Sequence, residues 1–152
     1  MNRETENNSI RMIFKNLPEN EKISRTTAAV FAAETDPTME ELSDLKTVVS
    51  EAVTNAIIHA YPHGSGDIEL YLKREGQTVY ITVKDYGVGI LDVARSMEPL
   101  YTTSEDQEHS GMGFTFMEAF SDSLDVTSEP GKGTVVKIIK MMGKEDEGGS
   151  DL

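Results

Sequence analysis

Apolar and polar side chains alternate in five short segments of this chain, and this pattern predicts a β-strand in each. The segments are residues 9–15, 67–73, 78–85, 124–128 and 134–142. Glycine-containing turns at residues 75–77 and 129–133 join the last four segments into two hairpins. Because a hairpin pairs its strands in opposite directions, we expect a sheet that is mixed or mostly antiparallel.

Helical segments lie between these strands. We expect helices at residues 22–34, 38–61, 90–97 and 113–122. They are indicated by an alanine-rich composition, by the helical spacing of apolar residues or by a glycine at the start of the segment. The second helix has a clear start, because Thr38 is followed three residues later by Glu41, which is the spacing of a capping box. Strands that cluster in hairpins, with helices between them, predict an α/β fold: a two-layer sandwich with the helices on one face of the sheet.

The long helix has two distinct faces. Its main apolar stripe consists of Leu42, Leu45, Val49, Ala52, Val53, Ala56 and Ala60. The opposite side carries Glu51, Asn55 and Asp44. Val48 and Ile58 lie beside them, although a fully solvated face has no need of apolar residues. We therefore expect this second face to be covered part of the time, by a lid or by a ligand.

Length and charge limit the classes of function. The 152 residues fit one domain, which we assign to residues 1–142, followed by an acidic, disordered tail at 143–152. The chain has 14 basic and 27 acidic residues, a net charge of −13, which argues against direct nucleic-acid binding because the phosphate backbone would be repelled. An anion bound to this chain would be held by local backbone amides and a metal ion.

The composition also bears on location. Cysteine is absent, which excludes disulfides, thiolate metal sites and cysteine nucleophiles. The N-terminus is polar, and no segment approaches the roughly 18 consecutive apolar residues of a membrane span. We expect a cytoplasmic protein that has no contact with a membrane.

Two glycine-rich segments suggest a binding site. Asp85 ends a predicted strand and is followed closely by Gly87 and Gly89, while Gly111 and Gly113 open a predicted helix. Glycine lets the backbone approach a ligand closely, and a helix N-terminus presents free amide hydrogens to an anion. A carboxylate at the end of a strand can accept a hydrogen bond from an amino group, such as the exocyclic amine of adenine.

The motifs "EAVTNAIIHAY", "DYGVGI", "SGMGF" and "GKGT" occur in this order. Together they resemble the adenine-nucleotide site of the GHKL (Bergerat-fold) ATPases and kinases, over about residues 9–142. The longer stretches "DPTMEELSDLKTVVSEAVTNAIIHAY" and "HSGMGFTFMEAF" are similar to the anti-sigma factor kinases of spore-forming bacteria. This resemblance implies the Bergerat ATP-binding fold, with ATP or ADP and Mg²⁺ as ligands.

The resemblance also implies roles for residues on two helices. Asn55 would coordinate the Mg²⁺ ion that bridges the phosphates. Glu51, one turn earlier, would be the catalytic general base that orients or deprotonates the attacking hydroxyl. Arg25, in the first predicted helix, matches a position that contacts partner proteins in this family.

The glycine segments would hold the two ends of the nucleotide. Asp85 would accept a hydrogen bond from the adenine amine. Gly87 and Gly89 would shape the adenine wall, which Thr134 would help to close. The segment that meets the phosphates would consist of Ser110, Gly111, Met112 and Gly113. Residues 98–110 would form the ATP lid.

The activity implied by the resemblance is that of an ATP-dependent protein serine kinase. Such a kinase phosphorylates an anti-anti-sigma factor on serine, and it binds and inhibits a sporulation sigma factor. The resemblance further implies a homodimer.

Two other functions are compatible with a nucleotide site of this kind. The ATP-binding half of a histidine kinase is disfavoured, because no histidine precedes His59 and none can serve as a phosphoacceptor on an earlier dimerising helix. A non-catalytic module that binds a sigma factor, with nucleotide as a conformational signal, stays open. It is favoured by His109, which stands where the family leads us to expect an arginine at the γ-phosphate.

Overall fold

The structure is a computed structural model that describes residues 7–90 and 113–143. Its strands are β1 (Asn8–Lys15), β2 (Asp67–Glu75), β3 (Thr78–Asp85), β4 (Ser123–Glu129) and β5 (Gly133–Met141). Its helices are α1 (Glu19–Ala32), the short 3-10 helix η2 (Ala33–Thr35), α2 (Met39–His59) and α4 (Gly113–Ala119). The five predicted strands and three of the four predicted helices are therefore present, with boundaries that differ by a few residues.

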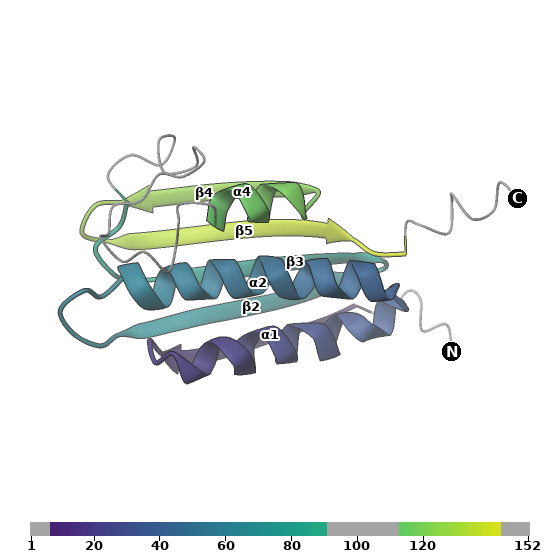
Figure 1. Ribbon diagram of the computed structural model, residues 1–152, viewed down its shortest axis with the longest axis horizontal. Helices are drawn as coiled ribbons and strands as arrows, with labels where there is room; N and C mark the ends of the chain where they lie inside the picture. Colours follow the sequence, from purple (N-terminus) through teal and green to yellow (C-terminus); the bar gives the residue numbers. More distant parts are fainter. Residues whose placement is uncertain (1–6, 91–112, 144–152) are drawn as a thin grey trace, which may run out of the picture.

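The strands form one sheet in the order β1-β2-β3-β5-β4 (Figure 1). Each neighbouring pair of the described strands is antiparallel, which is the mostly antiparallel arrangement that the hairpins predict. In the β3–β5 register Asp85 pairs with Thr134. The pairing brings the end of β3 next to the start of β5, although the two residues are far apart in the sequence.

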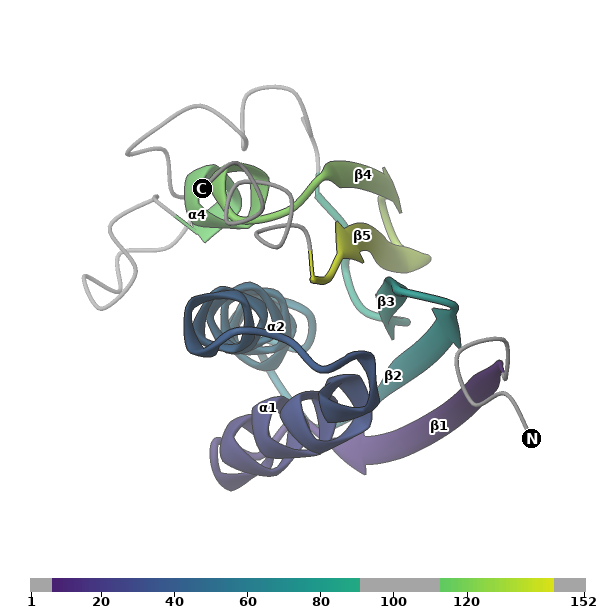
Figure 2. The same ribbon diagram turned by 90° about the vertical axis from the view of Figure 1, so that its right-hand side faces the viewer.

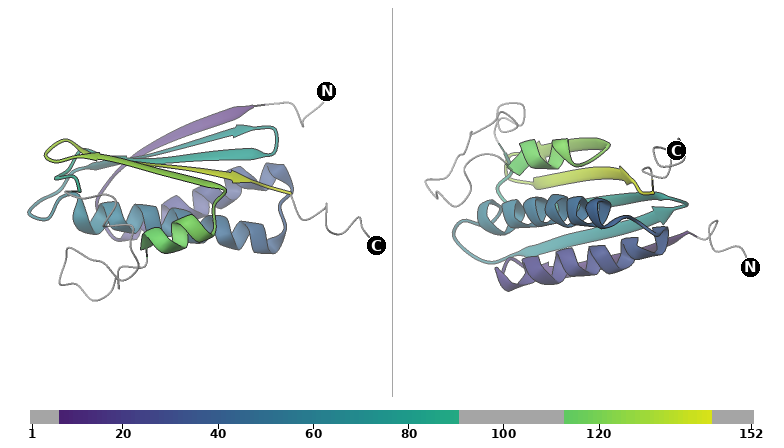
Figure 3. Two further views of the ribbon diagram at one scale, coloured as in Figure 1. Left: turned by 90° about the horizontal axis from the view of Figure 1, so that it is seen from above. Right: turned by 45° about the vertical axis from the view of Figure 1, so that its right-hand side comes forward.

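All three longer helices lie on one face of the sheet, as the end-on view in Figure 2 shows. Helix α2 runs between α1 and α4 and contacts both of them. The view from above in Figure 3 separates the helical layer from the sheet layer. The predicted two-layer α/β sandwich is confirmed.

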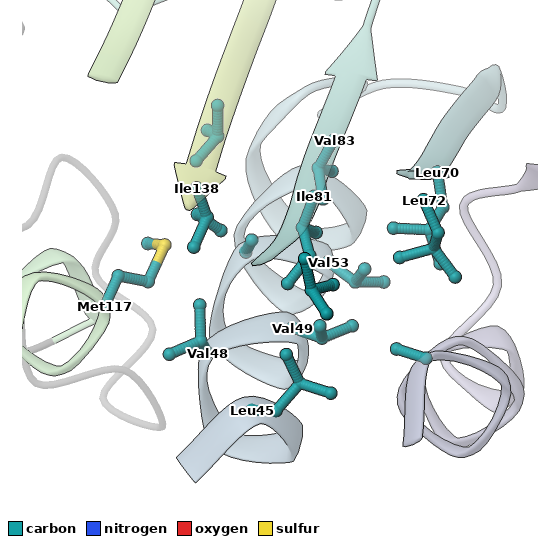
Figure 4. Close-up of a cluster of buried hydrophobic side chains, with 14 of the residues drawn as sticks. Leu45, Val48, Val49, Val53, Leu70, Leu72, Ile81, Val83, Met117 and Ile138 are labelled. Atoms are coloured by element: carbon teal, nitrogen blue, oxygen red, sulfur yellow. The ribbon is translucent and has the colours of Figure 1, made fainter. Parts of the chain in front are cut away.

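The core lies between these two layers. Alternate residues of the central strands point toward the helices and are buried: Ile68, Leu70, Leu72, Val79, Ile81, Val83, Val136 and Ile138. They pack against Leu45, Val49 and Val53 of α2 (Figure 4). Burial of apolar surface contributes roughly 25 cal/mol per Å², so this contact between layers is the main source of stability.

The prediction that the second face of α2 is covered only part of the time is wrong for Val48. Its side chain is 0% exposed and belongs to the core cluster. In Figure 4 it points toward the same space as Met117 of α4, which is also 0% exposed. A packed helix covers this part of α2, while Asp44 and Ile58 are half-buried.

Both ends of α2 are defined by local chemistry. At its start the Glu41 amide donates to Thr38 Oγ1 (3.0 Å) and the Thr38 amide donates to Glu41 Oε1 (2.9 Å), which is the predicted capping box. The Gly143 amide donates to the same Glu41 oxygen (2.9 Å). Helix α2 ends at His59, shortly before Pro62, whose ring is incompatible with a continuing helix.

Several predictions lie wholly or largely outside the described residues. They concern the helix at 90–97, the lid at 98–110 and the tail at 143–152. Within the described residues, no helix combines the length and the apolar character needed to cross a membrane. The domain limits and the cytoplasmic location stay predictions.

Candidate functional site

The predicted catalytic pair on α2 lies against the start of α4. A Cβ atom added to Gly113 would stand 3.1 Å from Glu51 Oε1, 3.2 Å from Asn55 Nδ2 and 3.5 Å from Asn55 Oδ1. Both side chains are half-buried. The backbone of α4 can come this close because Gly113 has no side chain. The structure therefore brings together one acid, one amide and one glycine from two separate motifs.

Asp85 lies at the end of β3 and is 6% exposed. Its Oδ1 atom accepts hydrogen bonds from the Gly87 amide (3.0 Å) and the Thr134 amide (3.3 Å). Burial raises the pKa of Asp85, and these two amide donors offset part of that rise. Among the described residues, both hydrogen bonds to the Asp85 carboxylate end on Oδ1 and none ends on Oδ2.

Two glycines beside Asp85 are required by close backbone contacts. A Cβ atom on Gly87 would collide with the carbonyl oxygen of Ala60, at the C-terminal end of α2. Gly133 has φ +116°, and a Cβ atom there would collide with the carbonyl oxygen of Asp85. Glycine tolerates both the positive φ and the contact. These glycines let α2, β3 and β5 meet closely around the Asp85 carboxylate.

The segment after Asp85 is fixed by backbone hydrogen bonds on two sides. The Val88 amide donates to the Ala60 carbonyl (2.9 Å), which ties the segment to α2. The Gly131 amide donates to the Val88 carbonyl (2.8 Å), which ties it to the β4–β5 turn. Gly89 has φ +80°, and a Cβ atom there would lie 2.5 Å from the Glu129 carbonyl oxygen. These contacts tie the segment after Asp85 to the end of α2 and to the β4–β5 turn.

Two hydroxyl groups in this region were missed by the sequence analysis. The Tyr61 hydroxyl accepts a hydrogen bond from the Tyr86 amide (2.9 Å). Ser128 Oγ accepts from the Ile90 amide (2.7 Å) and lies 2.8 Å from Thr134 Oγ1. The one signal for Ser128 was its place in an alternating strand, where it pairs with Thr134. Nothing in the pattern around Tyr61 indicated its contact.

The chemistry of Asn55 and Glu51 suits a hard divalent cation. An amide oxygen and a carboxylate are oxygen donors of the kind that Mg²⁺ prefers. Across residues 7–90 and 113–143, no group of three or more His, Cys, Asp and Glu could hold a metal ion alone. Mg²⁺ commonly binds through one or two protein groups and substrate phosphates. The residues therefore fit a metal ion that arrives with a nucleotide.

Other predicted residues lie apart from this group or outside the described chain. Arg25 is on α1, on the other side of α2 from α4, and its guanidinium is 3.5 Å from the carboxylate of Glu21. Ser110, Gly111 and Met112 fall outside the described residues, and so does His109. Their predicted roles are untested by the geometry.

The relatives of this chain decide its family. Residues 14–140 match the histidine kinase-like ATPase domain family. The anti-sigma F factor of Caldanaerobacter subterraneus is 48% identical over 138 residues, which cover 91% of this chain and 96% of that protein. The anti-sigma F factor of Bacillus licheniformis is 46% identical and that of Bacillus subtilis 45%, each over 90% of this chain and 94% of the relative.

This chain belongs to the anti-sigma F factor family. The resemblance noted in the motifs is confirmed, because the family match spans most of the chain and includes α2, the glycine segment after β3 and the start of α4. The roles of the individual site residues in this anti-sigma F factor stay predictions.

Solved structures support the fold of the family. The crystal structure of the RsbU and RsbW domains of Rv1364c from Mycobacterium tuberculosis has a TM-score of 0.63 at 16% identity. The alignment covers 89% of this chain and 32% of that longer chain. The mycobacterial sensor histidine kinase MprB has a TM-score of 0.55 at 15% identity, over 88% of this chain and 98% of that chain. At these identities the similarity supports the ATPase fold alone.

Proposed function

We propose that this protein is a serine kinase and an anti-sigma factor. It binds Mg-ATP, transfers the γ-phosphoryl group to a serine of an anti-anti-sigma factor, and binds and inhibits a sporulation sigma factor. The names of its relatives support the anti-sigma part of this proposal. The match to a histidine kinase-like ATPase domain supports the nucleotide.

One observation carries the kinase part: Glu51, Asn55 and Gly113 meet at the junction of α2 and α4. A phosphoryl-transfer site needs a group that activates the attacking hydroxyl, a ligand for the metal and backbone that can approach the phosphates. The junction offers one residue of each kind. Glu51 serves as the base, Asn55 as the metal ligand and Gly113 as the close backbone.

The nucleobase end of the site is assigned to Asp85. Its Oδ2 atom accepts a hydrogen bond from the exocyclic amine of adenine, while Oδ1 is held by two backbone amides. A charge-assisted hydrogen bond of this kind contributes on the order of 1.5–3 kcal/mol. Gly87, Gly89 and Thr134 form the surrounding wall, and Ser110, Gly111, Met112 and Gly113 hold the phosphates.

The phosphoryl transfer needs only groups that this chain, Mg-ATP and the partner serine supply. The serine oxygen of the partner forms a bond to the γ-phosphorus of ATP as the bond to the leaving ADP oxygen breaks. Glu51 accepts the proton that the serine hydroxyl gives up. Asn55 would hold a Mg²⁺ ion together with the phosphates, and that ion would supply neutralisation of the phosphate charge.

The charge of the protein favours release of the phosphorylated partner. Phosphoserine carries about −1.5 to −2 charges at neutral pH, and this chain has a net charge of −13. Repulsion between them weakens the product complex. Arg25 on α1 contacts the partner proteins, and the active form is a homodimer.

The experiment that tests this function is transfer from γ-labelled ATP to candidate anti-anti-sigma proteins. We expect Glu51→Gln to keep its affinity for ADP, because the side chain keeps its size and its amide oxygen can still accept hydrogen bonds. We expect the transfer rate to fall roughly 100-fold or more, the usual contribution of a general base. Glu40→Gln, an exposed position in the first turn of the same helix, serves as the matched control.

The same assay separates the second candidate, a non-catalytic module that binds a sigma factor in response to nucleotide. This candidate is favoured by His109, which is shorter than the expected arginine and only partly charged at neutral pH. It predicts nucleotide-dependent binding of the sigma factor with no labelled partner protein. Normal transfer by Glu51→Gln would instead show that the base is another group.

A further inference from the structure

We propose that Tyr61 is a positioning residue for the nucleobase end of the site. Its hydroxyl holds the backbone directly after Asp85 in place. By holding this backbone, it helps the site to distinguish a base that carries an amino group from one that carries a carbonyl oxygen. This inference rests on the proposed role of Asp85 as the acceptor for the adenine amine.

The Tyr61 hydroxyl links the start of β2 to the residue after β3 through two hydrogen bonds. It accepts from the Tyr86 amide (2.9 Å) and donates to the Asp67 carbonyl (2.6 Å). Tyr86 immediately follows Asp85, and Asp67 begins β2. A phenol has one hydrogen to donate, so the donation to Asp67 fixes its direction and leaves its oxygen as the acceptor for Tyr86.

The ring of Tyr61 also has a close neighbour. Gly66 lies so close to the ring that a Cβ atom there would collide with it. Gly66 is itself tied to Asn16 by two hydrogen bonds: the Asn16 amide donates to the Gly66 carbonyl (3.1 Å), and the Gly66 amide donates to Asn16 Oδ1 (3.1 Å). The phenol is therefore an anchored support for the residue after Asp85.

The phenol stays protonated at neutral pH. Burial raises the pKa of Tyr61, the hydrogen bond from the Tyr86 amide lowers it in part, and the nearby charge of Asp85 raises it further. The hydrogen that Tyr61 donates to Asp67 is thus retained under physiological conditions.

Tyr61 also connects the two halves of the site. It follows α2, the helix that carries Glu51 and Asn55, by two residues. The neighbouring Ala60 carbonyl accepts from the Val88 amide, so Ala60 and Tyr61 hold consecutive parts of the glycine segment. Removal of the hydroxyl frees the Tyr86 end of that segment and leaves the Val88 contact in place.

The test is Tyr61→Phe, which keeps the ring and removes only the hydroxyl. Calorimetry measures the affinity for ADP and for IDP, in which a carbonyl oxygen replaces the amine. We expect the affinity for ADP to fall about tenfold, the size of one hydrogen bond to a charged group, and the affinity for IDP to change little. The preference for ADP over IDP therefore shrinks.

Tyr71→Phe is the matched control, because Tyr71 lies on the outer face of β2, where its ring contacts Arg11. We expect its ADP to IDP ratio to equal that of the wild type. If Tyr61→Phe leaves the ratio of ADP affinity to IDP affinity unchanged, whether or not both affinities fall, the positioning role is overturned. A wild-type protein that binds both nucleotides equally would instead refute the assignment of Asp85, and the inference would fall with it.

A second measurement uses the wild-type chain and does not depend on how the variant folds. Hydrogen exchange followed by NMR reports the protection of single amides. We expect the Tyr86 amide to exchange slowly, because it donates to an anchored phenol although the Tyr86 side chain is exposed. Exchange at the rate of a free amide would overturn the proposal.

Discussion

Gly113 on α4 faces Glu51 on α2 so closely that an added methyl group would stand 3.1 Å from the Glu51 Oε1 atom. That separation is tighter than most contacts of a real Cβ atom, so either the carboxylate or the start of α4 has to move. The contact links the proposed base to the helix that follows the proposed phosphate-binding segment. Small changes at this junction should therefore affect catalysis before they affect folding.

The variant Gly113→Ala tests this link. We expect the phosphoryl-transfer rate to fall at least tenfold, because Glu51 and Asn55 are displaced from the geometry that the reaction needs. Alanine favours a helix by about 1 kcal/mol over glycine, so the free energy of unfolding should stay level or rise. Urea denaturation and the labelled-ATP assay measure the two quantities. Gly64→Ala is the control, since an added Cβ there meets nothing within 4 Å.

Asp85→Asn should separate ligand affinity from stability. Loss of the charge at Oδ2 is expected to weaken ADP binding roughly 10- to 100-fold, the equivalent of about 1.5–3 kcal/mol. Calorimetry with ADP measures this directly. Asp125→Asn, an exposed position on β4, provides the control, and an unchanged affinity in Asp85→Asn would contradict the assignment of the adenine contact.

Asp85→Asn should also change how the free energy of unfolding depends on pH. Burial raises the pKa of Asp85 above its ordinary value of 3.8, so the folded state binds the proton more tightly than the unfolded state does. The contribution of Asp85 to the free energy of unfolding is therefore most favourable below that value and falls as pH rises through the folded pKa. Ligand-free Asp85→Asn should be at least as stable as the wild type at pH 7, with a difference that shrinks toward pH 4. Denaturation across this range checks the sign.

Gly131 in the β4–β5 turn and Gly133 at the start of β5 offer a matched comparison. Gly131 and Gly133 both have positive φ, +83° and +116°, but an added Cβ meets nothing within 4 Å at Gly131 and collides with the Asp85 carbonyl at Gly133. We expect Gly131→Ala to cost about 1–2 kcal/mol from backbone strain alone. Gly133→Ala should cost clearly more, because β3 and β5 are forced apart at Asp85. Equal losses in chemical denaturation would mean that this close approach is relaxed in solution.

The capping box of α2 makes a further prediction about stability. Thr38→Ala removes one acceptor for the Glu41 amide and is expected to cost about 1 kcal/mol. Glu41→Ala should cost more, because one Glu41 oxygen accepts from both the Thr38 and the Gly143 amides. Urea denaturation ranks the two variants, with Glu40→Ala as an exposed neighbour for reference. The opposite ranking would show that the Gly143 contact adds nothing.

Local periodicity was sufficient to predict most elements of the fold. Strands with one buried face alternate with period two, so β1 to β5 were recognisable, and the capping box marked the start of α2. Helix α1 begins at Glu19, three residues before the predicted start, because the fixed φ of Pro18 suits a helix entry and the acidic Glu19 and Glu21 are favourable in a first turn. The strand order was beyond this reasoning, since it depends on pairings between distant segments.

The face of α2 shows what a helical projection leaves out. It correctly set Glu51 and Asn55 apart from the main apolar stripe, but it could not identify the neighbour that buries Val48. Met117 of α4 is distant from Val48 in sequence, but both belong to the same core cluster and point toward the same space in Figure 4. Val48, beside the proposed base, thus belongs to the core, whereas Ile58 is half-buried.

The contacts of Tyr61 and Ser128 were unpredictable for a different reason. Each hydroxyl bonds to a backbone amide, Tyr86 or Ile90, whose position depends on the complete fold. A single polar residue carries no periodicity, so its partner cannot be read from its neighbours. By contrast, Asp85 belongs to one of four motifs that occur in a fixed order, and the combination made it a candidate although a carboxylate before closely spaced glycines is common in turns.

The length of α2 makes this chain well suited to labelling. Its first turn holds Gly143 through Glu41, and its other end meets the glycine segment after Asp85 at Ala60. A helix of 21 residues is about 30 Å long, so the first turn of α2 lies far from the proposed nucleobase site at its other end. Because the chain contains no cysteine, a thiol introduced at Met39, which is 83% exposed, would be unique and could report the arrival of a partner without touching the site.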